Sequence, residues 1–286
     1  MKQVKGVYSA PPQHWVGDGF PVRSLFDYHN LGESISPFLL LDYASPTSFT
    51  PASAPRGVGP HPHRGFETVT IVFEGEVAHH DSTGQGGVIG PGEVQWMTAG
   101  SGILHQEYHS SAFTQRGGRL HMVQLWVNLP AAHKMTPPAY QAITAQQIPT
   151  LALPGGPGTA RVIAGTFAGV QGPAHTFSPL QVVDLHLPAG AQTVLDCTAG
   201  WTTMLVVLEG AIGLPGGAHA QAAQVALLER AHSPCALTAR TPTHALLLSG
   251  APLGEPIAGH GPFVMNTRAE IVQANQDFNS GSFGHL

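Results

Sequence analysis

Two short segments in the first half of the chain combine residue types and spacing that suit metal binding. His61 and His63 stand two residues apart, and His105 and Glu107 repeat that spacing further along. In extended backbone, side chains at i and i+2 project from the same face of a strand. Each segment therefore presents two ligands on one face, and if both segments line one barrel, four ligands converge on a single ion.

The ligand types indicate the chemistry. Neutral imidazoles with a carboxylate suit divalent Fe, Mn, Co, Ni, Cu or Zn, and three histidines with one carboxylate leave two positions of an octahedral ion open. Open positions accept substrate, water or O₂. No cysteine lies near these residues, which argues against a closed structural zinc site. The sequence predicts one divalent transition metal in a reactive site.

The carboxylate has an alternative. Glu67 stands four residues after His63 and shares its parity if the strand is unbroken, so sequence geometry leaves Glu67 and Glu107 both open. Arg64 has the opposite parity and is expected to point out of the barrel. Seven other residues near the two segments are expected to lie in the core or at the surface, or to hydrogen-bond to the ligands. They are Gln95, Trp96, Met97, His79, His80, His109 and His121.

The surrounding sequence favours an all-β fold. Hydrophobic residues make up 42% of the chain and charged residues 10%, with 35 glycines and 25 prolines that mark frequent turns. Many short apolar runs bounded by turn residues indicate sandwiches or barrels. The predicted strands are Phe38–Asp42, Glu67–Phe73, Gly75–His80, Val94–Thr98, Ile103–Tyr108, His121–Asn128, Gln181–Leu187, Met204–Leu208, Ala211–Leu214, Gln224–Leu228 and His244–Ser249.

Two copies of one β-barrel are expected. A segment rich in proline and glycine separates the two groups of strands, so we predict domains at 1–135 and 159–286 with a linker at 136–158. Glu74-Gly75 in the first half matches Glu209-Gly210 in the second, each between two strands. Counting back from Gly210 places Asp196 and Thr198 at the positions of His61 and His63. The second barrel is therefore expected to lack the ligands, which leaves one metal per chain.

The C-terminal segment differs from the rest. Thr267 and Glu270 form a capping box pattern, apolar residues follow at helical spacing, and Gly281 marks a stop. We predict a helix that packs on a barrel. Cys197 and Cys235 are expected to be buried thiols rather than a disulfide.

Charge and hydropathy exclude several functional classes. The net charge is −5 and neither sign gathers in runs, which argues against direct nucleic-acid binding. The sequence shows no signal peptide and no apolar run of about 18 residues. A cytoplasmic location without a membrane partner is expected.

Four longer blocks carry a resemblance to a known family. They are HPHRGFETVT (61–70), PGEVQWMTAGSGILHQE (91–107), QLWVNLP (124–130) and GPFVMNTRAEI (261–271). The sequence resembles the pirin family of the cupin superfamily from about Phe38 to the C-terminus. The segment Ala99 to Gly102 lacks the proline that usually precedes the last histidine in the general cupin pattern, but it follows the pirin pattern.

The resemblance implies a bicupin fold, with two jelly-roll-like β-barrels and a degenerate second barrel. It also implies a single Fe(II)-type site held by His61, His63, His105 and Glu107, and so favours Glu107 over Glu67. Pirins are associated with oxidative ring opening of the flavonol quercetin by O₂, and the animal protein with iron-dependent co-regulation of transcription factors.

These residues and the resemblance are consistent with two functions. The first is a quercetin 2,3-dioxygenase-type enzyme, in which a flavonol and O₂ meet at the metal and Glu107 is both ligand and general base. The second is a non-enzymatic iron-binding redox sensor that acts through a protein partner. The composition, with very few lysines, suggests a GC-rich bacterial genome and favours the enzyme.

Overall fold

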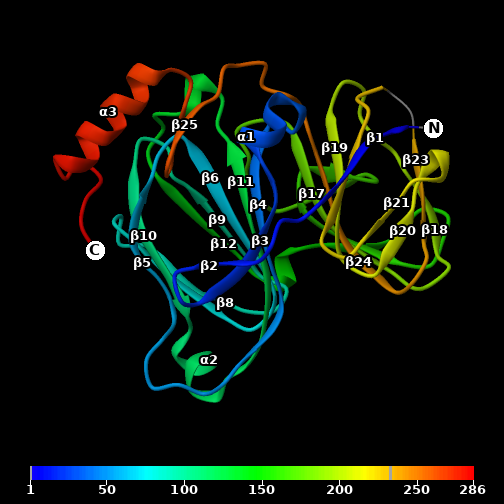
Figure 1. The fold of residues 1–286 in the computed structure, drawn as a ribbon, viewed down its shortest axis with the longest axis horizontal. Helices are drawn as coiled ribbons and strands as arrows, with labels where there is room; N and C mark the ends of the chain where they lie inside the picture. The colour runs from blue at the N-terminus through cyan, green and yellow to red at the C-terminus, as the bar shows by residue number, and fades with distance from the viewer. Residues whose placement is uncertain (1, 232–233) are drawn as a thin grey trace. The chain divides into compact units, whose positions relative to one another are not determined.

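The computed structural model describes residues 2–231 and 234–286, and its contacts divide the chain into two compact units. The unit called the N-terminal barrel here comprises Pro12–Arg23, Leu41–Ala145 and Gly254–Leu286. The unit called the C-terminal barrel comprises the start of the chain to Pro11, Ser24–Leu40 and Gln146–Leu253. Figure 1 shows the chain from end to end.

A seven-stranded sheet, a four-stranded antiparallel sheet and a two-stranded sheet form the N-terminal barrel, except that the end of β3 and the start of β4, within Ser24–Leu40, belong to the other unit. The large sheet is ordered β12 (Ala139–Ile143), β9 (Val94–Thr98), β6 (Phe66–Glu74), β11 (Gly118–Asn128), β4 (Phe38–Phe49), β3 (Phe20–Asp27) and β2 (His14–Val16). The four-stranded sheet is ordered β5 (Gly57–His63), β10 (Ile103–His109), β7 (Val77–Asp81) and β8 (Gly86–Ile89), and the small sheet pairs β25 (Ala258–His260) with β26 (Phe263–Met265).

The C-terminal barrel repeats this plan. Its seven-stranded sheet is ordered β1 (Val4–Ser9), β22 (Gln224–Leu228), β19 (Thr202–Glu209), β24 (Thr243–Gly250), β17 (Leu180–Leu187), β14 (Thr159–Ala164) and β13 (Thr150–Ala152). Its four-stranded sheet is ordered β18 (Gln192–Leu195), β23 (Cys235–Ala239), β20 (Ala211–Gly213) and β21 (His219–Gln221), and β15 (Thr166–Phe167) pairs with β16 (Val170–Gln171).

Few helices interrupt the strands in the described residues. The α-helices are α1 (Tyr28–Leu31), α2 (Ser111–Arg116) and α3 (Arg268–Asn279), and the 3₁₀ turns are η1 (Gly32–Ser34), η2 (Ala131–His133), η3 (Ala145–Gln147) and η4 (Pro215–Gly217). The predicted capping box of α3 is present, since Thr267 Oγ1 accepts from the backbone N–H of Glu270 while the Glu270 side chain accepts from that of Thr267. No helix in the described part of the chain is long and apolar enough to cross a membrane.

The predicted internal repeat corresponds to matching corners of the two barrels. Gly75 follows β6 and Gly210 follows β19, and each corner leads the chain from a large sheet into a four-stranded sheet. Both glycines have positive φ, +89° and +83°. A Cβ at Gly210 would lie 2.2 Å from the Pro242 carbonyl oxygen, so only glycine fits this turn.

The all-β, two-barrel prediction is confirmed, but the units are not consecutive halves of the chain. β1 pairs with β22, which gives the C-terminal barrel a strand from the start of the chain. The expected linker 136–158 contains β12 and β13, each at the edge of a seven-stranded sheet. Edge strands tolerate the prolines that surround them, because one side of an edge strand makes no ladder hydrogen bonds.

Candidate metal centre

β5 and β10 bring the three predicted histidines together in the N-terminal barrel. His61 lies directly opposite His105 in the antiparallel register, and His63 lies opposite Ile103. The ring centroids of His61 and His105 are 4.2 Å apart, and the ring centroid of His63 lies 4.9 Å from each of these two centroids. One ring nitrogen from each histidine lies within 4.8 Å of the others. The three imidazoles therefore converge as the spacing predicts.

A β-bulge in β5 helps to aim these rings. The register shifts between His105 and Glu107, because the three steps from Val58 to His61 on β5 lie opposite the two steps from His105 to Glu107 on β10. The extra residue lies beside Gly59, whose carbonyl oxygen accepts a hydrogen bond from His61 Nδ1 at 2.8 Å. Bulges of this kind redirect side chains near functional sites.

The hydrogen bonds leave one nitrogen of each ring available to a metal. Carbonyl oxygens only accept, so the contacts of His61 Nδ1 with Gly59 and of His63 Nδ1 with Pro262, at 3.3 Å, place the proton on Nδ1. Their Nε2 atoms therefore carry lone pairs. His105 Nε2 is buried and has no hydrogen-bond partner among the described residues. A buried imidazole nitrogen without a partner fits a metal ligand.

The electrostatics of the site keep the rings of His63 and His105 neutral. Burial, together with the neighbouring His61, lowers the pKa of His63 to about 3, although the Pro262 carbonyl opposes the shift. Burial also lowers the pKa of His105 well below its usual value, and the surrounding histidines add to this effect. Neutral imidazole is the form that binds a metal ion.

Glu107 faces the same site from β10. One of its carboxylate oxygens lies within 4.8 Å of ligand atoms of His79 and His105, so Glu107 belongs to a second ligand group that shares His105. Gln124 Nε2 donates to Oε2 at 2.8 Å, whereas Gln95 Nε2 and Thr70 Oγ1 donate to Oε1, each at 3.3 Å. These donors fix the orientation of the carboxylate.

His79 connects the site to a buried carboxylate. Its Nε2 lies 3.1 Å from Asp81 Oδ2, and its Nδ1 lies 3.3 Å from His105 Nδ1. Asp81 accepts a hydrogen bond from His79 Nε2, so the other ring nitrogen, Nδ1, is the acceptor. Nδ1 accepts hydrogen bonds from His105 Nδ1 and from Gln95 Nε2, the latter at 3.1 Å. Burial would raise the pKa of Asp81, but hydrogen bonds from His79 and Thr83 lower it. Asp81 therefore stays ionised and orients the ring behind His105.

Asp81 and Gln124 were not identified from the sequence. Asp81 follows His79 at the same i, i+2 spacing as the ligand pairs, which is the one local signal that could have found it. Gln124 lies on β11, in the other sheet of the barrel, and only the fold brings it to Glu107.

Glu67 does not share the parity of His63. β5 ends at His63, Gly65 adopts φ of +88°, and β6 begins at Phe66 in a different sheet. Glu67 accepts a hydrogen bond from Thr98 Oγ1 at 2.8 Å, and burial raises the pKa of its carboxyl to about 7. Glu67 occurs in no group of converging ligand atoms within the described residues.

Two buried basic side chains join the loop after His63 to the C-terminal segment. Arg64 points away from the histidines, as its parity predicts, and it is buried: Nε donates to the Ser101 carbonyl and Nη1 lies 2.7 Å from Asp277 of α3. Lys134 Nζ donates to the carbonyl oxygens of Gly65 and Val264 at 2.8 and 2.9 Å. α3 thereby supports the strand end that carries His63.

The other predicted neighbours lie in the core or at the surface. Trp96 and Met97 are fully buried, whereas His80 is exposed. His109 Nε2 donates to the Gly19 carbonyl at 2.9 Å, and His121 Nε2 lies 3.3 Å from the Tyr43 hydroxyl oxygen.

The C-terminal barrel has apolar residues where the histidines stand. The two four-stranded sheets have the same strand order. The cross-strand pair of Val77 with His109 in the first sheet corresponds to the pair of Ile212 with Ala239 in the second. Following this register, Cys235 takes the place of His105, Leu195 that of His61 and Cys197 that of His63. All three belong to the hydrophobic core of that barrel. The predicted equivalents Asp196 and Thr198 are therefore wrong by one residue, and both are exposed. The residues at the corrected positions, Leu195, Cys197 and Cys235, do not repeat the histidine pattern of the N-terminal barrel.

A small pocket of about 30 Å³ opens beside His61 and Glu107. Drug-sized ligands occupy sites of about 300–1,000 Å³. Mostly apolar side chains surround the pocket, and its lining comprises Val16, Phe20, Val22, Asp42, Val58, His61, Glu107, Met122 and Gln124.

Comparison with known proteins agrees with this arrangement. The family model described as Pirin matches residues 19–127, and that described as the Pirin C-terminal cupin domain matches residues 182–284. The chain belongs to the pirin family. It is therefore a bicupin, and most of the Pirin match, including the three histidines, lies in the N-terminal barrel.

Individual relatives extend over the whole chain. A Pseudomonas aeruginosa protein provisionally named quercetin 2,3-dioxygenase is 58% identical over 99% of both chains. A crystal structure of quercetin 2,3-dioxygenase from Acinetobacter baumannii is 54% identical, with a TM-score of 0.97 over 99% of both chains. The nickel(II) complex of the pirin YhhW from Escherichia coli, at 21% identity, shares the fold with a TM-score of 0.66 over 86% of this chain and 99% of its own.

Proposed function

We propose that this pirin is a metal-dependent dioxygenase that opens the central ring of a flavonol such as quercetin with O₂. The observation that carries the proposal is the convergence of three imidazoles that each keep Nε2 available to a metal. One of them, His61, lines a pocket together with the Glu107 carboxylate. The names of the two relatives described above support the substrate class.

His61, His63, His105 and Glu107 are the residues that would hold the metal, and Fe(II) is the expected ion. The same donors accept Mn, Co, Ni, Cu or Zn. When bound, the metal supplies Lewis-acid chemistry that lowers the pKa of a coordinated flavonol hydroxyl. Three histidines and one carboxylate leave room for the substrate and O₂.

Glu107 is placed to take the hydroxyl proton of the substrate. Its Oε1 already accepts from Gln95 and Thr70, whereas Oε2 accepts only from Gln124 among the described residues. A carboxylate oxygen has two acceptor sites, so Oε2 keeps one for the metal or for a proton. The two glutamine amides hold the carboxylate in place as its charge changes.

The small volume of the pocket adds a requirement for substrate entry. A flavonol exceeds the volume beside His61, so the apolar side chains of β2 and β3 that line the pocket, Val16, Phe20 and Val22, must move aside. Once bound, the same side chains exclude water from the reacting ring.

Oxygen uptake with quercetin tests the proposal. Protein loaded with Fe(II) should consume O₂ as the flavonol absorbance disappears, and His61→Ala should abolish both signals together with the bound metal. His80→Ala is the matched control, because His80 is exposed on β7 and contributes to neither ligand group of the described residues. Uptake by the wild type no faster than that of His61→Ala would refute the proposed activity.

A further inference from the structure

A second group of converging side chains lies on the C-terminal barrel. Asp184 and His186 stand at i and i+2 of β17, and His244 of β24 lies directly opposite His186 in the antiparallel register. One ligand atom from each residue lies within 4.8 Å of the others. Their β17 neighbours Val183, Leu185 and Leu187 belong to the barrel core. The three polar side chains therefore project from the opposite face of the sheet.

The donor atoms are close to the spacing of a metal site. Asp184 Oδ1 lies 3.2 Å from His186 Nε2 and 2.7 Å from His244 Nε2. The two imidazoles stack, with centroids 4.2 Å apart and an interplanar angle of 18°. Donors bound to tetrahedral zinc at 2.0–2.1 Å lie about 3.3 Å from one another. To bind one ion, the imidazoles must turn out of their parallel stack, and the ion must replace the Nε2 protons that they now share with Asp184 Oδ1.

Asp184 is held as a charged acceptor. Burial would raise its pKa, but hydrogen bonds from His186 and His244 lower the pKa below its usual value. Arg161 Nη1 lies 3.2 Å from Oδ2, so the guanidinium engages one oxygen while Oδ1 faces the imidazoles. The carboxylate is therefore ionised and already oriented toward the two rings.

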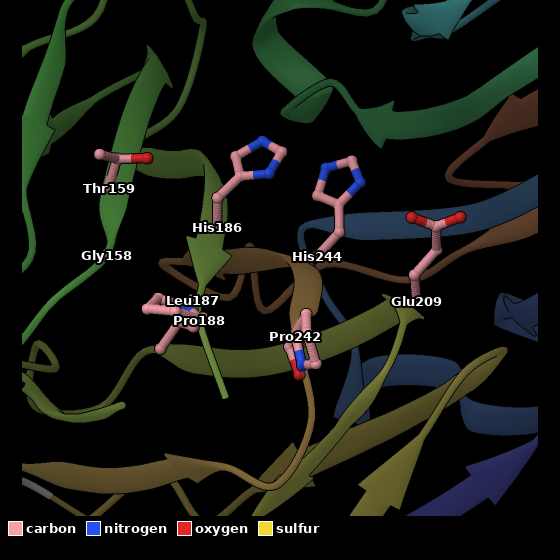
Figure 2. A pocket seen from close by; sticks show the side chains of 9 residues that line it. Gly158, Thr159, His186, Leu187, Pro188, Glu209, Pro242 and His244 are labelled. Atoms are coloured by element: carbon pink, nitrogen blue, oxygen red, sulfur yellow. The ribbon is translucent and has the colours of Figure 1, made fainter. Parts of the chain in front are cut away.

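The group is open to solvent on one side. A pocket of about 440 Å³ is lined by His186, His244 and Glu209, and the His186 side chain is 47% exposed, whereas that of Asp184 is 1% exposed. Figure 2 shows the two imidazoles side by side with the Glu209 carboxylate beside His244. Glu209 is the register partner of His244 on β19. Water or this second carboxylate can complete the coordination of an ion.

We propose that Asp184, His186 and His244 bind a divalent transition metal of the zinc class on the C-terminal barrel. Two imidazoles and a carboxylate form a ligand set that zinc favours, and the pocket leaves a coordination position for water or a small ligand. The site is not the counterpart of the proposed centre, whose equivalent positions in this barrel are Leu195, Cys197 and Cys235. It adds a second metal to the one expected from the sequence.

Zinc stoichiometry of the full chain tests the proposal. The protein is stripped with a chelator and dialysed against Zn(II), and bound zinc is measured by elemental mass spectrometry. The wild type should bind two ions per chain. His186→Ala should bind one, and so should the double variant His61→Ala/His63→Ala, in which the remaining ion occupies the site proposed here.

The controls separate this site from the other and from surface binding. His219→Ala removes an exposed histidine of the same barrel and should still bind two ions. Co(II) in the double variant should give a visible absorption band that His186→Ala and His186→Gln each abolish in that background. Equal zinc binding by the wild type and His186→Ala would overturn the proposal. Loss of an ion in His186→Ala but not in the double variant would instead refute the proposed centre in the N-terminal barrel.

Discussion

Glu67→Gln tests the electrostatics of the N-terminal barrel and the choice of carboxylate at the same time. Glu67 is buried, and its pKa is raised from 4.5 to about 7 by burial, against a hydrogen bond from Thr98. The folded protein therefore binds a proton at this carboxyl more tightly than the unfolded chain does. Between the two pKa values the wild type must lose stability as the pH rises.

The magnitude follows from the two pKa values. With 4.5 in the unfolded chain and about 7 in the folded protein, the ionisation of Glu67 lowers the free energy of unfolding by about 2.5 kcal/mol between pH 5 and pH 8. The loss begins near the unfolded pKa and levels off above the folded one. Glutamine does not ionise, so Glu67→Gln should lack this slope.

Urea denaturation in excess chelator measures the effect, because the difference between wild type and variant at each pH isolates the one group. The stability of the wild type relative to Glu67→Gln should fall by about 2.5 kcal/mol from pH 5 to pH 8. Parallel curves would refute the raised pKa. Bound iron gives the second readout: Glu67→Gln should keep the metal content of the wild type, and Glu107→Gln should reduce it. The reverse pattern would make Glu67 the ligand.

Two further substitutions test the site. Gln124→Ala removes the shortest hydrogen bond to the Glu107 carboxylate and should lower metal affinity or flavonol turnover by about 10–100-fold. Gln141→Ala on β12 is the control. Unchanged affinity and turnover in Gln124→Ala would show that the carboxylate does not need this hydrogen bond. Val16→Ala enlarges the pocket at a partly buried position and should raise kcat/KM for quercetin, measured by steady-state O₂ uptake, while the metal content stays unchanged. A lower kcat/KM would argue against substrate entry past β2.

The strand pattern and the histidine spacing were readable because both are local. Alternation along a strand fixes the face of each side chain, so the spacing of His61 and His63 alone predicts that their side chains converge. The corner glycines Gly75 and Gly210 exposed the repeat, since only glycine fits these turns. The capping box of α3 is equally local.

Other assignments failed where a count of residues crossed an irregularity. The reversal at Gly65 ended the parity that joined Glu67 to His63. In the C-terminal barrel the count from Gly210 slipped by one residue and selected Asp196 in place of Leu195. A slip of one residue moves every side chain to the other face of the sheet, so counting along the chain does not replace the observed register.

By itself the sequence determined an all-β pirin with two barrels and three histidines at the spacing of metal ligands. The tertiary structure decided what surrounds them: Gln124 on Glu107, the contact of Asp81 with His79, and the pairing of His186 with His244. The reason is physical, because cross-strand neighbours depend on sheet order and register, which are set by contacts between residues far apart in the chain.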